Sequence, residues 1–132
     1  RTVDLEGSTK SIAGAKAAGI RRFVQVSAIS VDEPVPADAG EVWKAYVEAK
    51  RDADIALRDS DLEWTILRPG GLTDEPATGR VKLAEKVDRD TIPRADVAAV
   101  IAAVIDDDAT VGKQWELVSG DASIDEAIAA VL

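Results

Sequence analysis

The sequence predicts an α/β fold in which a mostly parallel, doubly wound sheet is covered by helices on both faces. Segments with helical spacing alternate with short β-rich segments along the 132 residues. Such alternation favours right-handed crossovers, which make neighbouring strands parallel. About three to four segments qualify as strands, whereas a doubly wound sheet commonly has about five or more. We therefore expect a single domain over residues 1–132 that forms the C-terminal half of an incomplete sheet.

The composition excludes several classes of function. A formal net charge of −9 provides no electrostatic footprint for nucleic acid or for anionic lipid. No apolar run approaches the roughly 18 residues of a membrane span, so we expect a cytoplasmic protein with no membrane contact. The chain has no Cys and no His, which excludes disulfides, the usual zinc sites and His-dependent catalysis within it. Acid–base chemistry is left to Asp, Glu, Lys, Tyr, Ser or Arg.

The first half of the chain is predicted to hold two helices, a strand and a loop. Helical spacing over residues 2–18 ends at Gly19, which suits the left-handed conformation that stops helices. Residues 22–28 form a short strand, and the Pro-rich, acidic residues 31–40 form a loop. Residues 41–60 form the clearest helix, because one face repeats at helical spacing: Val42, Trp43, Tyr46, Ala49, Lys50, Ala53, Ala56 and Leu57.

The middle of the chain is predicted to be extended. Residues 63–68 form a strand that the Pro-Gly-Gly sequence at 69–71 ends, and residues 80–84 form a short edge strand. Ligands of parallel α/β sheets lie beyond the C-terminal ends of the strands. The loops over residues 31–41 and 73–79 are therefore expected to frame a substrate pocket.

The last third is predicted to be helix, strand and helix. Pro93 suits the first position of a helix that runs to about Asp106, and residues 114–119 form a strand. Ser123 and Glu126 match a capping box that opens a helix over residues 124–132. The buried face of the first helix is expected to be Val97, Val100, Ile101, Val104 and Ile105. The acids at 106–108 lie at the C-terminal end of this helix, where the helix macrodipole disfavours negative charge, so we expect that end to fray.

Small residues share one face of the first helix with an acid. Asp4, Gly7, Ser11 and Gly14 are three or four positions apart, which places them on that face. Gly costs about 1 kcal/mol of helix propensity, so we expect the glycines to allow close approach to another backbone. The helix begins at Arg1 with no Met before it, which indicates a native start upstream; a trimmed tag or leader is the alternative.

A Tyr-x-x-x-Lys pattern is the main candidate for chemistry. Tyr46 and Lys50 are four positions apart, so their side chains are neighbours on one helix face. A nearby ammonium group lowers the pKa of a phenol, which can then act as a general acid or base. The Lys can also hold ribose hydroxyls. The alternative is a half-buried Tyr beside a solvated Lys.

Ser27 and the 68–72 segment are further candidates. Ser27 ends a predicted strand at the sheet rim, where its hydroxyl can bond a substrate carbonyl or merely satisfy a turn. The sequence Arg68-Pro69-Gly70-Gly71-Leu72 allows close backbone approach, and its N–H groups can bind a carboxamide. The alternative is a plain turn that ends the strand.

Two charged residues have local alternatives. Asp4 is either a hydrogen-bonding site residue or an acid that complements the helix dipole. Arg94 either meets a cofactor phosphate or pairs with Asp96, and the local pair is the favoured interpretation.

Together these features resemble the C-terminal portion of atypical short-chain dehydrogenase/reductases. These are NAD(P)H-binding, epimerase/dehydratase-like proteins with a Rossmann fold. The resemblance covers nearly the whole chain in the family's order: residues 3–7 (VDLEG), 17–24 (AAGIRRFV), 26–27 (VS), 46–51 (YVEAKR), 65–72 (TILRPGGL), 92–98 (IPRADVA) and 116–120 (ELVSG).

The resemblance implies a role for each matching residue. Tyr46 matches the catalytic acid/base, and Lys50 the residue that tunes it and binds the nicotinamide ribose. Ser27 matches the serine that polarises the substrate, and Asp4 stands where the wider superfamily usually has Asn. The segment Pro69, Gly70, Gly71 and Leu72 matches the one that packs near the nicotinamide of NAD or NADP.

One family feature is absent from the chain. It has no Gly-x-x-Gly-x-x-Gly turn, the motif that seats the pyrophosphate on a helix N-terminus. We therefore expect the chain alone to bind a dinucleotide poorly. The strand at 22–28 would also lack a neighbour in the family's strand order. An unpaired edge promotes self-association, which we expect for the isolated chain.

Three functions remain open at this stage. The main prediction is an NAD(P)-dependent oxidoreductase or epimerase-like protein that transfers hydride between a nicotinamide and a carbonyl or alcohol substrate. The second is a non-catalytic NAD(P)-binding sensor. The third is an α/β interaction domain without a cofactor.

Overall fold

The computed structural model describes residues 2–29, 31, 38 and 40–132, without the side chains of residues 2–6 and 8. Its elements, in chain order, are α1 (Thr2–Ala17), β1 (Arg22–Val26), α2 (Glu41–Arg58), β2 (Glu63–Pro69), β3 (Gly71–Thr73), β4 (Arg80–Ala84), β5 (Thr91–Pro93), α3 (Arg94–Ile105), a short 3-10 helix η1 (Asp108–Thr110), β6 (Lys113–Ser119), β7 (Ala122–Ser123) and α4 (Ile124–Val131). Most of the predicted loop at 31–40 lies outside the described residues.

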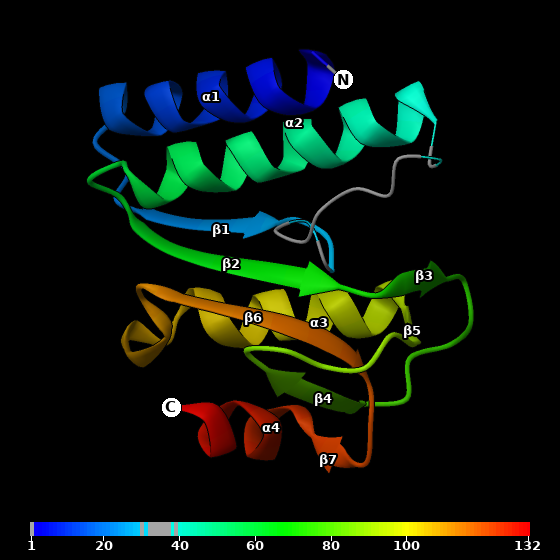
Figure 1. The fold of residues 1–132 in the computed structure, drawn as a ribbon. Helices are drawn as coiled ribbons and strands as arrows, with labels where there is room; N and C mark the ends of the chain where they lie inside the picture. The colour runs from blue at the N-terminus through cyan, green and yellow to red at the C-terminus, as the bar shows by residue number, and fades with distance from the viewer. Residues whose placement is uncertain (1, 30, 32–37, 39) are drawn as a thin grey trace.

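The predicted α/β architecture is confirmed. Within the described residues, five strands form a sheet in the order β1-β2-β6-β4-β7. β1, β2 and β6 are parallel, and β4 is antiparallel to β6. Figure 1 shows α1 and α2 side by side on one face of the sheet, with α3 and α4 on the other. The parallel strands thus end at the same edge of the sheet.

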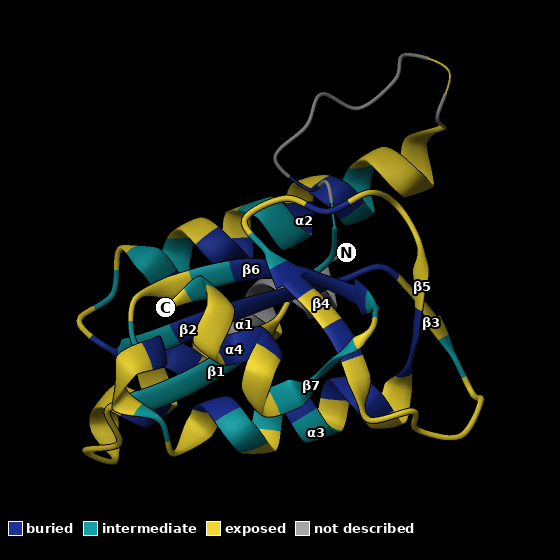
Figure 2. Ribbon diagram, turned by 90° about the horizontal axis from the view of Figure 1, so that it is seen from below, coloured by how far each residue is buried: buried dark blue, intermediate teal, exposed yellow. Residues whose placement is uncertain are grey.

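Two apolar clusters hold the layers together. The larger lies between the sheet and α3 and α4, and includes Leu67, Val100, Trp115 and Leu117. The smaller lies between β1, β2 and the pair α1 and α2, around Leu57 and Ile66. Figure 2 shows the buried strands in dark blue and the exposed first turn of α2 in yellow. α2 therefore anchors on the sheet through its middle and C-terminal turns.

The sheet has more strands than the sequence predicts. β3, β5 and β7 contain only two or three residues, too few for an alternating pattern to reveal them. β4 is not an edge strand, because β7 pairs with its outer side. Pro69 is itself the last residue of β2, where it pairs with Leu117, and the chain continues through Gly70 into β3.

Several expected helix faces differ from the structure. A Cβ on Gly7 or Gly14 would meet no described atom within 4 Å, so these glycines do not mediate the expected close approach. α1 packs instead through Ile12 and Ala15. Ile105 in α3 is exposed rather than buried, and the repeating face of α2 includes the exposed Val42 and Trp43.

Helix ends follow the predicted signals. Gly19 has a φ of 75°, and the bonds from Gly19 to Lys16 and from Ile20 to Ala15 close a Schellman motif. The capping box of Ser123 and Glu126 is present. Pro93 is the N-cap of α3 rather than its first residue, because it pairs in β5 with an extended ψ of 138°.

Arg22 closes the C-terminal end of α3. Its guanidinium donates to the carbonyls of Val104 (2.8 Å) and Ile105 (3.1 Å). The last carbonyls of a helix lack partners and favour positive charge. This cation, supplied from β1, offsets the acids that follow α3, and no local pattern in the sequence indicates it.

The close approach at Gly70 predicts a stability difference between two glycines. A Cβ at Gly70 would lie 2.2 Å from the Asp90 carbonyl oxygen. Gly70→Ala should destabilise the fold by roughly 1–3 kcal/mol, as overpacking does. Gly14→Ala, on the open face of α1, should be neutral or stabilising by up to about 1 kcal/mol. Urea denaturation measures both, and equal effects would contradict the contact.

Candidate functional site

The Tyr-x-x-x-Lys pair lies together near the middle of α2. Lys50 Nζ lies 5.9 Å from the centre of the Tyr46 ring. Both side chains are half-buried, so each is accessible while its position is restrained. The predicted pairing on one helix face is therefore confirmed, while a catalytic role remains a prediction.

An apolar groove opens beside Tyr46. The rings of Tyr46 and Trp43 stack, with centres 5.5 Å apart and planes inclined by 23°. The groove has a volume of about 540 Å³ and is lined by Gly40, Glu41, Val42, Trp43 and Tyr46. Volumes of this order are typical of small-molecule pockets.

Ser27 is held to α2 by an acid that the sequence analysis did not identify. Its hydroxyl donates to Asp54 Oδ2 at 2.6 Å, and both residues are buried. Gln25 donates to Asp54 Oδ1 at 2.7 Å, and Arg68 donates to Oδ2 through Nε (3.1 Å) and Nη2 (2.8 Å). Asp54 follows Lys50 by four positions, which is the signal that could have identified it.

The N–H groups of the Pro-Gly-Gly segment are engaged within the chain. The N–H of Gly70 donates to the Leu117 carbonyl, and that of Gly71 to the Asp90 carbonyl, both at 3.0 Å. The expectation that these two groups bind a carboxamide is therefore wrong. What remains accessible is the Leu72 side chain, which is 43% exposed.

Arg94 does not pair with Asp96. It forms an exposed ion pair with Asp74, in the loop before β4. Asp96 instead accepts from the N–H groups of Thr78 (3.1 Å) and Gly79 (2.9 Å) and from the Thr78 hydroxyl. Residues two positions apart on a helix point in different directions, which explains the difference.

Asp4 lies in α1, but its side chain is outside the described residues. Its proposed role at the site therefore stays a prediction.

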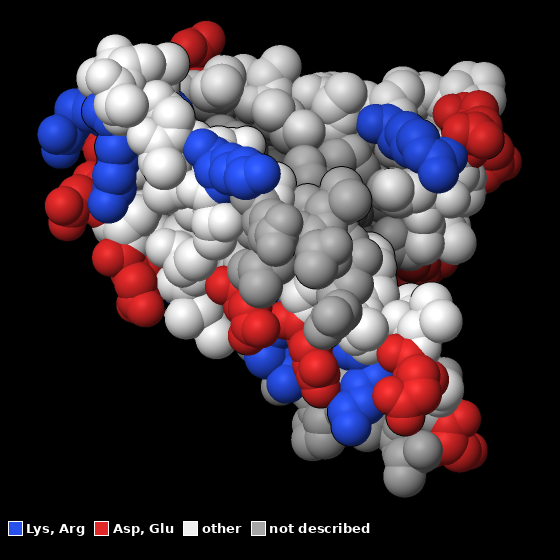
Figure 3. Space-filling view, turned by 90° about the horizontal axis from the view of Figure 1, so that it is seen from above, with Lys and Arg blue, Asp and Glu red and all other residues white. Residues whose placement is uncertain are grey.

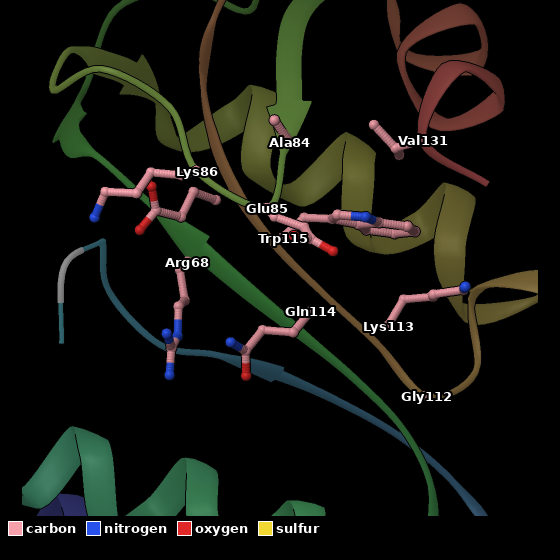
Figure 4. Close-up of a pocket in the computed structure, with 10 residues that line it drawn as sticks. Arg68, Ala84, Glu85, Lys86, Gly112, Lys113, Gln114, Trp115 and Val131 are labelled. Atoms are coloured by element: carbon pink, nitrogen blue, oxygen red, sulfur yellow. The ribbon is translucent and has the colours of Figure 1, made fainter. Parts of the chain in front are cut away.

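A larger cavity lies away from Tyr46. It has a volume of about 730 Å³ and runs along β6 and the end of β4. Its lining mixes cations and acids, among them Arg68, Lys86, Lys113, Glu85 and Glu116. Figure 4 shows Arg68 and Gln114 pointing to the side of the sheet that carries α2.

On the face that carries α1 and α2, the described residues form no single basic region. Figure 3 shows Lys and Arg side chains on this face interspersed with Asp and Glu. Among the described residues, no helix is long and apolar enough to cross a membrane.

Comparison with known proteins assigns the family. Residues 1–108 match the family of NAD(P)H-binding proteins. The chain belongs to this family. The predicted resemblance to atypical short-chain dehydrogenase/reductases, and the expectation of NAD or NADP as the family's cofactor, are confirmed.

The relatives include proteins named as epimerases and reductases. The chain is 42% identical over 126 residues to an uncharacterized sugar epimerase, YhfK of Bacillus subtilis, covering 96% of this chain and 58% of the relative. A putative NAD-dependent epimerase/dehydratase from Bacillus halodurans superposes with a TM-score of 0.88 at 38% identity, covering 98% of this chain and 60% of the other. ChuY, an anaerobillin reductase from Escherichia coli O157:H7, superposes with a TM-score of 0.80 at 30% identity, covering 92% of this chain and 61% of ChuY. The chain thus spans about three fifths of these proteins.

Asp96 makes the stability of the fold dependent on pH. Burial opposes ionisation of Asp96, but the bonds from Thr78 and Gly79 outweigh it and hold its pKa below the ordinary 3.8. A lowered pKa in the folded state stabilises the fold above the ordinary pKa, and this stabilisation disappears as pH falls through the folded value.

We therefore expect Asp96→Asn to destabilise the fold at pH 7 by about 1–3 kcal/mol, the cost of lost bonds to a buried charge. The difference from the unmodified protein should shrink as the pH falls below about 4. Urea denaturation between pH 2 and 7 measures it, with the exposed Asp125→Asn as control. A difference that stays constant over this range would contradict the assignment.

Proposed function

We propose that this chain carries the acid–base half of an NAD(P)-dependent oxidoreductase or epimerase-like enzyme. The observation that carries the proposal is the Tyr46–Lys50 pair beside an apolar groove, in a chain of the NAD(P)H-binding family. Relatives named as a reductase and as epimerases support this reaction class.

In the proposed reduction, Tyr46 donates its phenolic proton to the substrate carbonyl oxygen. Bound NAD(P)H would supply the hydride for the carbonyl carbon, and an alcohol results. Lys50 favours the phenolate that remains, because an ammonium nearby stabilises negative charge. Solvent then returns the proton to Tyr46, and the reverse sequence oxidises an alcohol.

The residues present fit the nicotinamide end of the cofactor. Lys50 would hold ribose hydroxyls, and the exposed Leu72 side chain offers an apolar surface to the ring. Thr73 Oγ1 is buried without a hydrogen-bond partner among the described residues, and is available to a carboxamide. The ion pair of Arg94 with Asp74 is exposed, so a phosphate could displace the carboxylate. A pyrophosphate turn is not part of this chain, so we propose that the chain alone binds dinucleotide weakly.

A non-catalytic NAD(P)-binding sensor is the second candidate. It is favoured by the bond from Ser27 to Asp54, which keeps the hydroxyl proton of Ser27 away from a substrate carbonyl.

Turnover by the complete protein separates these candidates. Tyr46→Phe removes the proton donor and should lower kcat by about 10²–10⁴-fold. The affinity for NADPH should change little, because the ring and its stack on Trp43 remain. NADPH oxidation with carbonyl or quinone substrates measures kcat, and fluorescence titration measures binding. Glu48→Gln, on the exposed face of α2, is the control; unchanged turnover in Tyr46→Phe would refute the role.

We also propose that the isolated chain associates through β1. The N–H of Ser27 donates to the Leu67 carbonyl, and the N–H of Glu63 donates to the Arg21 carbonyl. The backbone N–H and C=O groups of the odd-numbered residues along β1 therefore point to β2. By the alternation of a parallel ladder, the backbone N–H and C=O groups of Val24 and Val26 point to the other side of β1, where the described part of the chain provides no neighbouring strand. Such an edge pairs readily with another strand.

Sedimentation velocity on residues 1–132 tests this association. Val26→Pro removes an edge N–H without touching the β2 ladder and should make the chain monomeric. Val42→Lys changes an exposed apolar residue of α2 and should leave association unchanged. A chain that is already monomeric, or one that Val42→Lys dissociates, would count against the β1 edge.

A further inference from the structure

Asp54 is the buried acid at which α2, β1 and β2 meet. It is 0% exposed, yet it accepts four hydrogen bonds: one from Ser27, one from Gln25 and two from Arg68. Because all four partner groups are hydrogen-bond donors, both carboxyl oxygens of Asp54 must act as acceptors. An ionised carboxylate meets that requirement, whereas an amide of the same shape would set its own N–H against a donor.

The position of Asp54 on α2 relates it to the proposed acid–base pair. Tyr46, Lys50 and Asp54 are four positions apart in turn, so they occupy successive turns on one side of the helix. The first turn of α2 is exposed and has no side-chain cap bond at Gly40. The polar attachment at Asp54 therefore helps to set where the turns bearing Tyr46 and Lys50 lie relative to the strand ends.

The same bonds restrict what Ser27 can do. A serine hydroxyl has one proton, and that of Ser27 is directed to Asp54 at 2.6 Å. Hydrogen bonds to a charged acceptor are stronger than those to a neutral carbonyl. Ser27 is also only 5% exposed. A neutral substrate carbonyl would thus compete poorly for this proton.

We propose that Asp54 is a positioning residue of this site. It accepts hydrogen bonds from the Ser27 hydroxyl and the Arg68 guanidinium and so fixes α2 against β1 and β2. Tyr46 then protonates the substrate oxygen without help from Ser27. The inference rests on the proposed function for its kinetic part, whereas the hydrogen bond itself can be tested without turnover.

The kinetic test uses the complete protein with single and double variants. Ser27→Ala should lower kcat by less than about fivefold. The change removes one of the four hydrogen bonds to Asp54, and in this proposal Ser27 donates no hydrogen bond to the substrate. Asp54→Asn should lower kcat by about a hundredfold, while the KM for substrate and the Kd for NADPH stay within about threefold. Ser27→Ala should add nothing to Asp54→Asn, and Asp52→Asn, exposed on the same helix, should match the unmodified protein.

Two results would overturn the inference. If Ser27→Ala alone lowers kcat a hundredfold at unchanged stability to urea, Ser27 donates to the substrate. If Asp54→Asn raises KM and Kd together with its loss of kcat, its role is only structural. Should Asp54→Asn fail to fold, Ser27→Ala still tests the proposal. The loss of kcat should be less than about fivefold if Ser27 only bonds Asp54, and about a hundredfold if Ser27 donates to the substrate.

A measurement on the unmodified protein separates this inference from the proposed function. Proton NMR should show a hydroxyl resonance that exchanges slowly with water and is absent in Ser27→Ala. If the resonance is present but no substrate is turned over, the proposed function fails while the Asp54 bond stands. If no protected hydroxyl is found, the inference fails whatever the activity.

Discussion

The placement of α2 depends on the buried ion pair between Asp54 and Arg68. Both side chains are almost fully enclosed, and their closest atoms are 2.8 Å apart. Removing one partner of such a pair costs about 3–5 kcal/mol, because the other charge stays buried. A well-packed apolar pair could stabilise the fold equally, so we infer that the ion pair serves to position α2 rather than to add net stability. That specificity matters here because α2 also carries Tyr46 and Lys50.

Three further contacts position the strands and turns around this ion pair. Arg22 joins the start of β1 to the end of α3, and so ties α3 to the sheet. Gly70 lets the Asp90 carbonyl approach the end of β2, which directs the chain into β3. Asp96 fixes the turn at Thr78 and Gly79 from which β4 begins. The contacts of Gly70 and Asp96 lie near the rim where ligands of such sheets bind, whereas the contact of Arg22 lies at the opposite edge, where the parallel strands begin.

Local signals explain which features could be predicted from the sequence. Gly19, the Ser123 capping box and the Tyr46–Lys50 spacing each depend on a few neighbouring residues, and the structure contains all three. The family followed from several short motifs in order. Contacts between distant segments were not predictable in this way. The spacing of Asp54 four positions after Lys50 places it on the same side of α2, but it is one acid among many on an acidic chain, and its burial depends on partners in β1 and β2. Arg94 finds its partner across a loop, and strands of two or three residues carry no periodicity.

In the proposed function, α2 presents Tyr46 and Lys50 to a nicotinamide cofactor. A crystal structure of the complete protein with bound NADP⁺ is the decisive experiment. We expect Lys50 Nζ to lie within hydrogen-bonding distance of the nicotinamide ribose hydroxyls, with the Tyr46 hydroxyl beside the nicotinamide ring and Leu72 packed against that ring. A cofactor whose nicotinamide lies away from α2, with Tyr46 and Lys50 making no contact with it, would refute this placement.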